Sequence, residues 1–148
     1  MKKFTVPVFI VLAIVLVGCG ESTPAPTDMA GIVASDGDVQ TYCYYMVDVT
    51  TGPDVTVVVD SSPGPITIDV ERSKSCIFYI MKSIYTHFKP SSVSVSIEAL
   101  LQDQYGKQST GNIATAMLTQ ATASKLVWDN LDPDSAWSDY DNMWLLSS

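Results

Sequence analysis

The residues of this chain that could carry chemistry are three cysteines, one histidine and a group of aspartates near the C-terminus. Cys19, Cys43 and Cys76 are far apart, and no further Cys or His stands at the spacing of a zinc site. The spacing around His87 indicates no Ser-His-Asp or Cys-His arrangement. The sequence also contains no glycine-rich phosphate loop and no His-Glu-x-x-His motif. It therefore predicts no catalytic residue and no cofactor.

The surroundings of Cys19 are the most specific feature of the sequence. Two lysines precede an apolar run over residues 4–17, which has the length of a signal-peptide core and is too short for a permanent membrane span. The run ends in Leu16-Val17-Gly18-Cys19, which resembles the lipobox of bacterial lipoprotein precursors. The resemblance implies that residues 1–18 are removed and that Cys19 carries the lipid on its sulfur, because a thiolate is the nucleophile that accepts an acyl chain.

The location follows from the same resemblance. Acylated Cys19 would hold the protein in the lipid bilayer of the cell membrane or the outer membrane, with the domain outside the cytoplasm. One alternative is a plain signal peptide in which Cys19 is incidental, and another is an uncleaved anchor. Both alternatives also place the domain outside the cytoplasm.

The chain after the leader divides into a tether and one domain. Residues 19–36 contain a Pro-, Ser- and Thr-rich stretch, which predicts a flexible tether, and residues 37–148 have the length of a single small domain. Removal of the leader leaves 6 basic residues against 16 acidic ones, a formal charge of −10. This charge argues against nucleic-acid binding, which needs a basic surface. The negative charge is explained by solubility and by repulsion from the bilayer. A more specific hypothesis is that it attracts a cationic partner or a divalent metal.

Cys43 and Cys76 remain as a pair once Cys19 is assigned to the lipid. Exported proteins fold in an oxidising compartment, so the pair predicts a disulfide. The alternative is two buried free thiols.

The pattern of apolar residues predicts an α+β fold. Apolar residues alternate with polar ones in several segments, which is typical of strands with one buried face. A helical period over residues 70–88, with Thr67 as the N-cap and Pro90 as the stop, predicts a central helix. Residues 114–131 suit either a strand or a helix, and we expect a second helix from about Gln120 to Asn130 with Thr119 as its N-cap. The predicted strands are residues 39–49, 55–60, 93–101 and 113–118.

The order β-β-α-β-β predicts a two-layer fold. We expect an antiparallel sheet of about four strands, with the central helix and the second, C-terminal helix on one face.

Aromatic and acidic residues gather in the last part of the chain. Tryptophan and tyrosine are frequent at contact hot spots, so these aromatics are a candidate binding surface, and the alternative is that they close a small core. The aspartates could hold calcium, although they do not follow the EF-hand pattern. The aromatics are Trp128, Trp137, Tyr140 and Trp144, and the acids are Asp129, Asp132, Asp134, Asp139 and Asp141.

Two classes of function fit these features. The first is a non-catalytic binding domain of the bacterial envelope with a protein or glycan partner. The second is a small envelope hydrolase that uses the clustered aspartates, with or without a metal. Convergence of Asp139 and Asp141 in a pocket would favour the hydrolase, and solvent-facing aspartates beside exposed aromatics would favour the binding domain.

Overall fold

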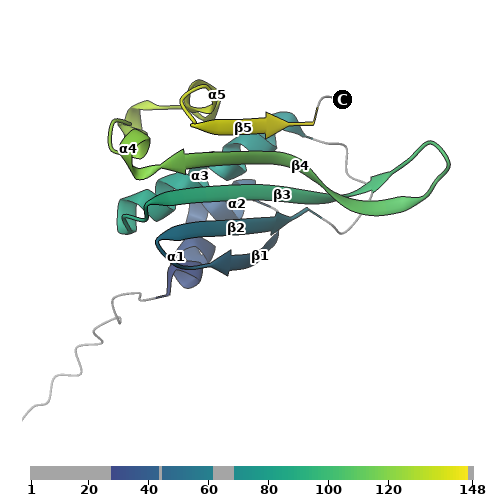
Figure 1. Cartoon of the computed structure of the whole chain (residues 1–148), viewed down its shortest axis with the longest axis horizontal. Helices are drawn as coiled ribbons and strands as arrows, with labels where there is room; N and C mark the ends of the chain where they lie inside the picture. Colours follow the sequence, from purple (N-terminus) through teal and green to yellow (C-terminus); the bar gives the residue numbers. More distant parts are fainter. Residues whose placement is uncertain (1–27, 44, 62–68, 147–148) are drawn as a thin grey trace, which may run out of the picture.

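The computed structural model of the chain describes residues 28–43, 45–61 and 69–146 (Figure 1). The predicted leader, the segment around Cys19 that resembles a lipobox, the Pro-rich part of the predicted tether and Thr67 lie outside the described residues. No helix in the described ranges has the length and apolar character needed to cross a membrane.

Five strands form one sheet in the order β1-β2-β3-β4-β5. The fold is therefore α+β, as predicted, but the sheet has one strand more than expected and is mixed, since β2 and β3 are parallel. The parallel pair arises because the central helix α3 (Val70–His87) connects the two strands and returns the chain to the end of the sheet where β2 begins, so β3 runs in the same direction. The strands are β1 (Tyr45–Thr50), β2 (Asp54–Asp60), β3 (Ser92–Gln102), β4 (Gln108–Thr119) and β5 (Asn142–Leu145).

The central helix α3 (Val70–His87) provides most of the helical side of the core. Its N-cap is Asp69, whose side chain accepts a hydrogen bond from the backbone N–H of Arg72. The helix starts at Asp69 and not at Thr67, because the Asp69 carboxylate satisfies a first-turn N–H group. The apolar stripe of α3, with Ile77, Ile80 and Ile84 fully buried, packs on the inward valines of the sheet.

The first described residues form two short helices, α1 (Met29–Ser35) and α2 (Gly37–Tyr42). The prediction of a strand over residues 39–49 is therefore wrong in its first half, and only residues 45–50 are extended. The physical reason is Asp36, whose side chain accepts hydrogen bonds from the backbone N–H groups of Asp38 and Val39 and so starts a helix. Met29 and Val33 are buried, so folded structure also begins before residue 37, within the segment assigned to the tether.

The segment after β4 contains three short helical turns, and the first two lie where one helix over about residues 120–130 was expected. The three turns are α4 (Gln120–Ala123), the 3-10 turn η1 (Trp128–Asn130) and α5 (Pro133–Trp137). The predicted N-cap at Thr119 is confirmed, because its side chain accepts a hydrogen bond from the backbone N–H of Thr122. The ambiguous residues 114–119 belong to strand β4.

The described residues form two layers, and none of them covers the second face of the sheet. In Figure 1 the helices α1, α2 and α3 lie behind the sheet, and the other face of the sheet is in front. Strands β3 and β4 continue past their neighbours as a two-stranded hairpin over residues 99–111, which we call the arm. Gly106 forms the turn at its tip with a φ of 83°, a value that glycine adopts without strain.

Candidate binding surface on the open sheet face

The predicted pair of cysteines forms a disulfide. Cys43, at the end of α2, is bonded to Cys76 of α3, and both side chains are buried. The bond joins the N-terminal helices to the central helix across a sequence separation of 33 residues. Its position inside the core indicates a role in stability, because a buried disulfide is poorly accessible to thiols in solution.

The four aromatics of the candidate binding surface do not form one surface. Trp128 packs against Phe78 of α3, with ring centroids 5.7 Å apart. Trp137 packs edge-on against Tyr140, and Tyr140 is only 6% exposed. Trp128 and Trp137 pack against the core and Tyr140 belongs to it, whereas Trp144 is largely exposed, at 46%.

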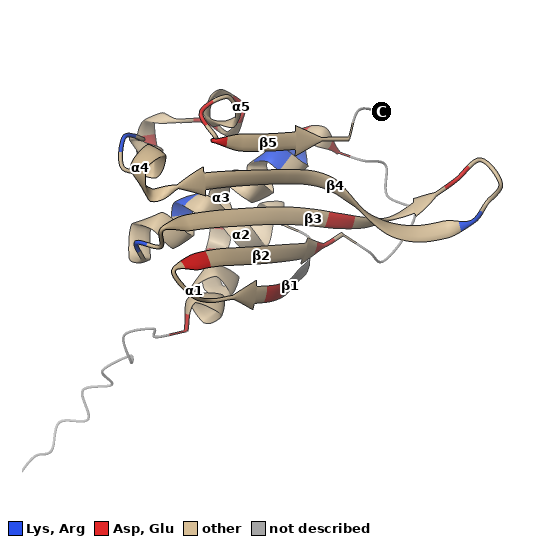
Figure 2. Cartoon of the chain, in the orientation of Figure 1, with Lys and Arg blue, Asp and Glu red and all other residues tan. Residues whose placement is uncertain are grey.

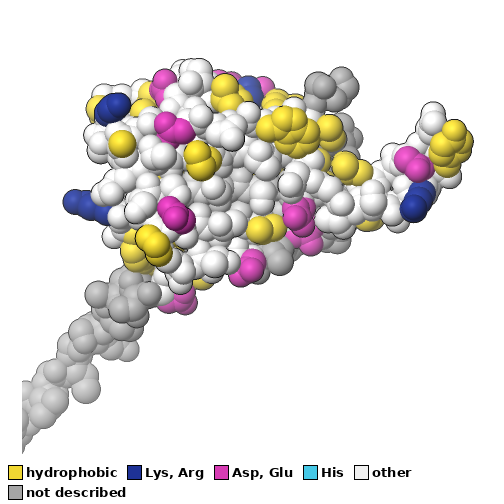
Figure 3. Space-filling view, viewed as in Figure 1, with side chains coloured by type: hydrophobic (Ala, Val, Ile, Leu, Met, Phe, Trp, Pro, Cys, Tyr) yellow, Lys and Arg dark blue, Asp and Glu magenta, His cyan; other side chains and the backbone are white. Residues whose placement is uncertain are grey.

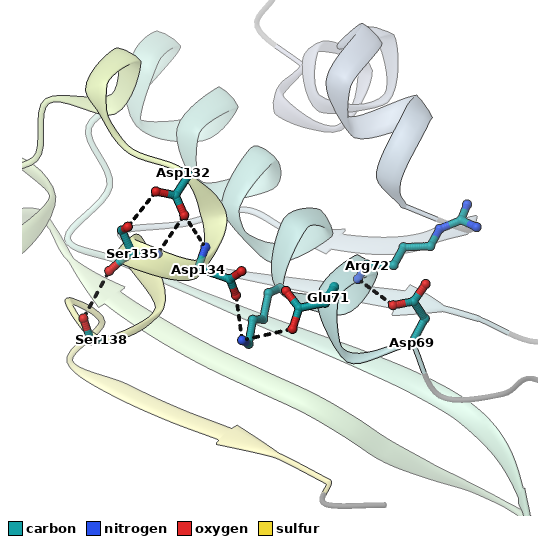
Figure 4. A network of polar contacts seen from close by, with 8 residues as sticks. Asp69, Glu71, Arg72, Asp132, Asp134, Ser135 and Ser138 are labelled. Carbon is teal, nitrogen blue, oxygen red and sulfur yellow. Dashed lines mark hydrogen bonds and ion pairs between the residues drawn. The ribbon is translucent and has the colours of Figure 1, made fainter.

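The C-terminal aspartates act at separate places. The Asp132 side chain accepts hydrogen bonds from the backbone N–H groups of Asp134 and Ser135 at the start of α5, and the Ser135 hydroxyl also donates to it (Figure 4). The Ser135 hydroxyl is the main reason that the pKa of Asp132 lies below its ordinary value. The ammonium group of Lys74 lies 2.7 Å from a carboxylate oxygen of Asp134 and lowers the pKa of that carboxyl.

Two more of these aspartates bind donor groups from other segments of the chain. Asp129 pairs with Lys82 of α3 at 2.9 Å. Asp141 accepts hydrogen bonds from the Thr122 hydroxyl at 2.7 Å and the Thr119 backbone N–H at 2.6 Å, and these donors, the hydroxyl first, lower its pKa. Asp139 is exposed and makes no contact of this kind among the described residues.

The hydrolase hypothesis needs Asp139 and Asp141 to converge in a pocket. Neither Asp139 nor Asp141 lines either of the two hollows described below. In the described ranges, no three side chains of His, Cys, Asp or Glu come together in a way that could hold a metal ion.

The uncovered side of the sheet, which we call the open face, presents the outward residues of all five strands. Burial alternates along β2 and β3, so their even-numbered residues point outward, and strand register identifies the outward residues of the other strands. One row crosses the whole sheet through the pairs Asp48–Val58, Val58–Ser96, Ser96–Thr115 and Thr115–Trp144. The open face consists of Asp48, Thr50, Asp54, Thr56, Val58, Asp60, Ser94, Ser96, Glu98, Asn112, Thr115, Met117, Asn142 and Trp144.

A shallow hollow of about 200 Å³ lies in the middle of the open face. Its floor is low because the central positions carry short hydroxyl side chains, and larger side chains stand on either side. Its hydroxyl and amide groups can donate and accept hydrogen bonds, and the rest of its lining is apolar. The lining residues are Thr56, Ser94, Ser96, Thr115, Met117 and Asn142, with Val95 and Ala116 from the same strands.

The described strands carry no basic residue, whereas acidic residues lie on both layers of the protein. In Figure 2 the strands over the body of the sheet carry acidic positions, and the basic positions lie on the helices, at the α4 end and near the tip of the arm. Figure 3 shows the open face, where acidic side chains are spread over the surface and basic ones stand at its margins. On the helical side, Lys74 and Lys82 are engaged with Asp134 and Asp129.

A second hollow, of about 180 Å³, lies beside Trp128 on the helical side and is lined by Tyr85, Lys89, Gln120, Ala123 and Ser124. Its tyrosine has a structural role, because the Tyr85 hydroxyl donates a hydrogen bond of 2.6 Å to the carbonyl of Leu118. Burial raises the pKa of Tyr85 to about 12. The hydroxyl therefore stays protonated near neutral pH and is engaged in holding α3 to β4.

The sequence predicted that one side of residues 93–101 meets water, and this is confirmed for β3. The sequence did not identify the open face as a whole. That surface includes strand β5, which was not predicted. A usable signal was present, since the segments that form strands contain acidic residues and no Lys or Arg. Comparison of the chain with protein-family models, with curated proteins and with solved structures found no match.

Proposed function

We propose that this protein is a lipid-anchored domain outside the cytoplasm that binds a partner through the open face and catalyses no reaction. The observation that carries the proposal is the uncovered side of the sheet, with its hydroxyl-lined hollow and the exposed ring of Trp144 beside it. A sheet with one face on the core needs polar residues on the other face to remain soluble, and this face adds an exposed indole and a concave floor. Large exposed aromatic groups are frequent at binding surfaces.

The anchor part of the proposal is supported by the sequence around Cys19 and by the disulfide. A bond between Cys43 and Cys76 is typical of a protein that folds in an oxidising compartment, as an exported domain does. The hydrolase hypothesis has less support, because Asp132 caps a helix and Asp129, Asp134 and Asp141 bind donors of the protein itself.

The anchor is tested by cell fractionation of the Cys19→Ser variant in the bacterial host. We expect the wild-type protein in the membrane fraction and the variant in the soluble fraction, because the serine hydroxyl does not accept the lipid in place of the thiolate. A variant that remains fully bound to membranes would contradict the lipid anchor.

The binding surface is tested by a photo-crosslinking amino acid in intact cells. The group is placed at Thr56 of the open face in one strain and at Thr86 of α3 in another, since both positions are exposed threonines on opposite layers. We expect a crosslinked partner from position 56 and none from position 86. Equal capture at both positions, or capture at position 86 alone, would refute the assignment of the open face.

A further inference from the structure

We infer that the open face takes a positively charged segment of a protein partner, rich in lysine and arginine and laid across the strands. This inference rests on the proposed function and adds the chemistry of the partner to it.

The charge of the strands is the first argument. The five described strands contain four acidic residues, Asp48, Asp54, Asp60 and Glu98, and no Lys or Arg. All four project from the open face, by the alternation of burial in β2 and β3 and by the pairing of Asp48 with outward Val58. The face therefore carries charge of one sign, which attracts a basic partner and disfavours an acidic one.

The placement of two of these acids is the second argument. Asp60 and Glu98 are register partners on the parallel strands β2 and β3, so their backbones are about 4.8 Å apart. Asp60 also makes an interaction within the protein, so a basic segment would chiefly meet Glu98 and Asp48 on this face. The third acid, Asp48, lies roughly 12 Å from Glu98 across two strand spacings and two residues. A basic segment with charges spaced along its length matches this separation.

The shape of the surface is the third argument. The short side chains of Ser94, Ser96 and Thr115 lower the floor between the acids on β1 to β3 and the exposed ring of Trp144 on β5. Lys and Arg have long apolar stems that can lie over such a floor while their charged ends reach carboxylates. The same cations interact favourably with the face of a tryptophan ring. A second copy of the chain fits less well, because it would bring one acidic face against another.

The inference is tested by calorimetric titration of the full-length protein, purified in a non-ionic detergent, with two synthetic octapeptides. One peptide repeats Lys-Ala and the other repeats Glu-Ala. We expect binding of the lysine peptide alone, weakened as salt screens the charges. The Asp48→Asn/Glu98→Gln variant should raise Kd about fivefold, because it removes two exposed charge pairs.

The matched control is Asp38→Asn/Glu71→Gln, which makes the same change in net charge on the helical layer. It should change Kd by less than about twofold, because its charges lie away from the open face. Trp144→Ala should weaken binding of the lysine peptide and abolish the peptide-induced change in tryptophan fluorescence. If net charge alone were responsible for binding, Trp144→Ala would not weaken the binding of the lysine peptide.

The inference is overturned if the lysine peptide does not bind, if both double variants weaken it equally, or if the glutamate peptide binds as well. Recovery of a glycan or a second copy of the chain from position 56 in cells would also overturn it. If position 56 captures a partner but the lysine peptide fails to bind, the proposed function stands and the cationic partner is wrong.

Discussion

The ring of Trp128 lies against the ring of Phe78, with centroids 5.7 Å apart, so the segment after β4 is fixed to the central helix by an aromatic contact. Tyr85 stacks on the same indole, with ring centroids 6.3 Å apart. Trp128 thus has two aromatic neighbours on α3, whereas Trp144 stands on the open face.

The first prediction follows from this difference between two tryptophans. Trp128→Ala should lower the free energy of unfolding by about 2–3 kcal/mol, because it leaves a cavity between α3 and η1. Trp144→Ala should change it by less than about 0.5 kcal/mol, as is usual for surface positions. Urea denaturation followed by circular dichroism measures both values. Equal losses would show that Trp144 also closes the core.

The second prediction concerns the disulfide. Replacement of both Cys43 and Cys76 by serine should lower the free energy of unfolding by about 3–4 kcal/mol, from the loop that the bond closes in the unfolded chain. Thiol titration of the unfolded, unreduced protein provides the matching chemical measurement. Two reactive thiols from this pair would contradict the bond.

Strand β3 shows what could be predicted from the sequence. Its residues 92–99 alternate strictly between outward and buried positions, because one face packs on α3 and the other is open, and alternation was therefore a reliable signal. The helix α3 was predicted for the same reason, since its buried residues repeat with a helical period. Both elements lie in the middle of the fold, where burial dictates residue type.

The failures have local causes. Residues 39–42 alternate as a strand would, but the cap at Asp36 and the burial of Val39 on a helix make them part of α2. Strand β5 has only four residues, and its pairing with β4 joins segments that are distant in the sequence. No local sequence pattern therefore predicts it. The parallel pairing of β2 and β3 was available from the strand-helix-strand order, which favours a crossover. The open face depends on all three of these features.

The third prediction compares two buried hydroxyls. Tyr85→Phe should cost about 1 kcal/mol, because it removes the hydrogen bond to the Leu118 carbonyl and leaves that acceptor without its donor. The Tyr140 hydroxyl is buried and has no hydrogen-bond partner among the described residues. Tyr140→Phe should therefore be neutral or stabilise by up to about 1 kcal/mol. The unfolding midpoints of the two variants in urea decide this, and a loss at Tyr140 as large as that at Tyr85 would reveal a missed partner.

The fourth prediction concerns acid stability. The Thr122 hydroxyl and the Thr119 backbone N–H lower the pKa of Asp141 in the folded state from its ordinary value of 3.8. The folded state therefore binds fewer protons than the unfolded state in this range. The resulting stability is present above the ordinary value and is lost as the pH falls through the folded value.

Unfolding midpoints measured from neutral pH down to about pH 2 should thus fall less steeply for Asp141→Asn than for the wild-type protein. Thr122→Val removes the largest cause of the lowered pKa and should flatten the acid slope in the same direction. Combining Thr122→Val with Asp141→Asn should flatten the slope no further than Asp141→Asn alone. Independent, additive effects would show that the two side chains are not coupled.

The bond between Cys43 and Cys76 has a mechanical consequence for a domain held by its N-terminus. Tension that enters the described chain at Asp28 runs along α1 and α2 to Cys43 and crosses the covalent bond directly into α3. The chain from residue 44 to residue 75, which includes the edge strand β1, is bypassed by the load. Tension between the anchor and the C-terminal part of the chain would therefore pass from Cys43 into α3 and leave the pairing of β1 with β2 outside the covalent load path.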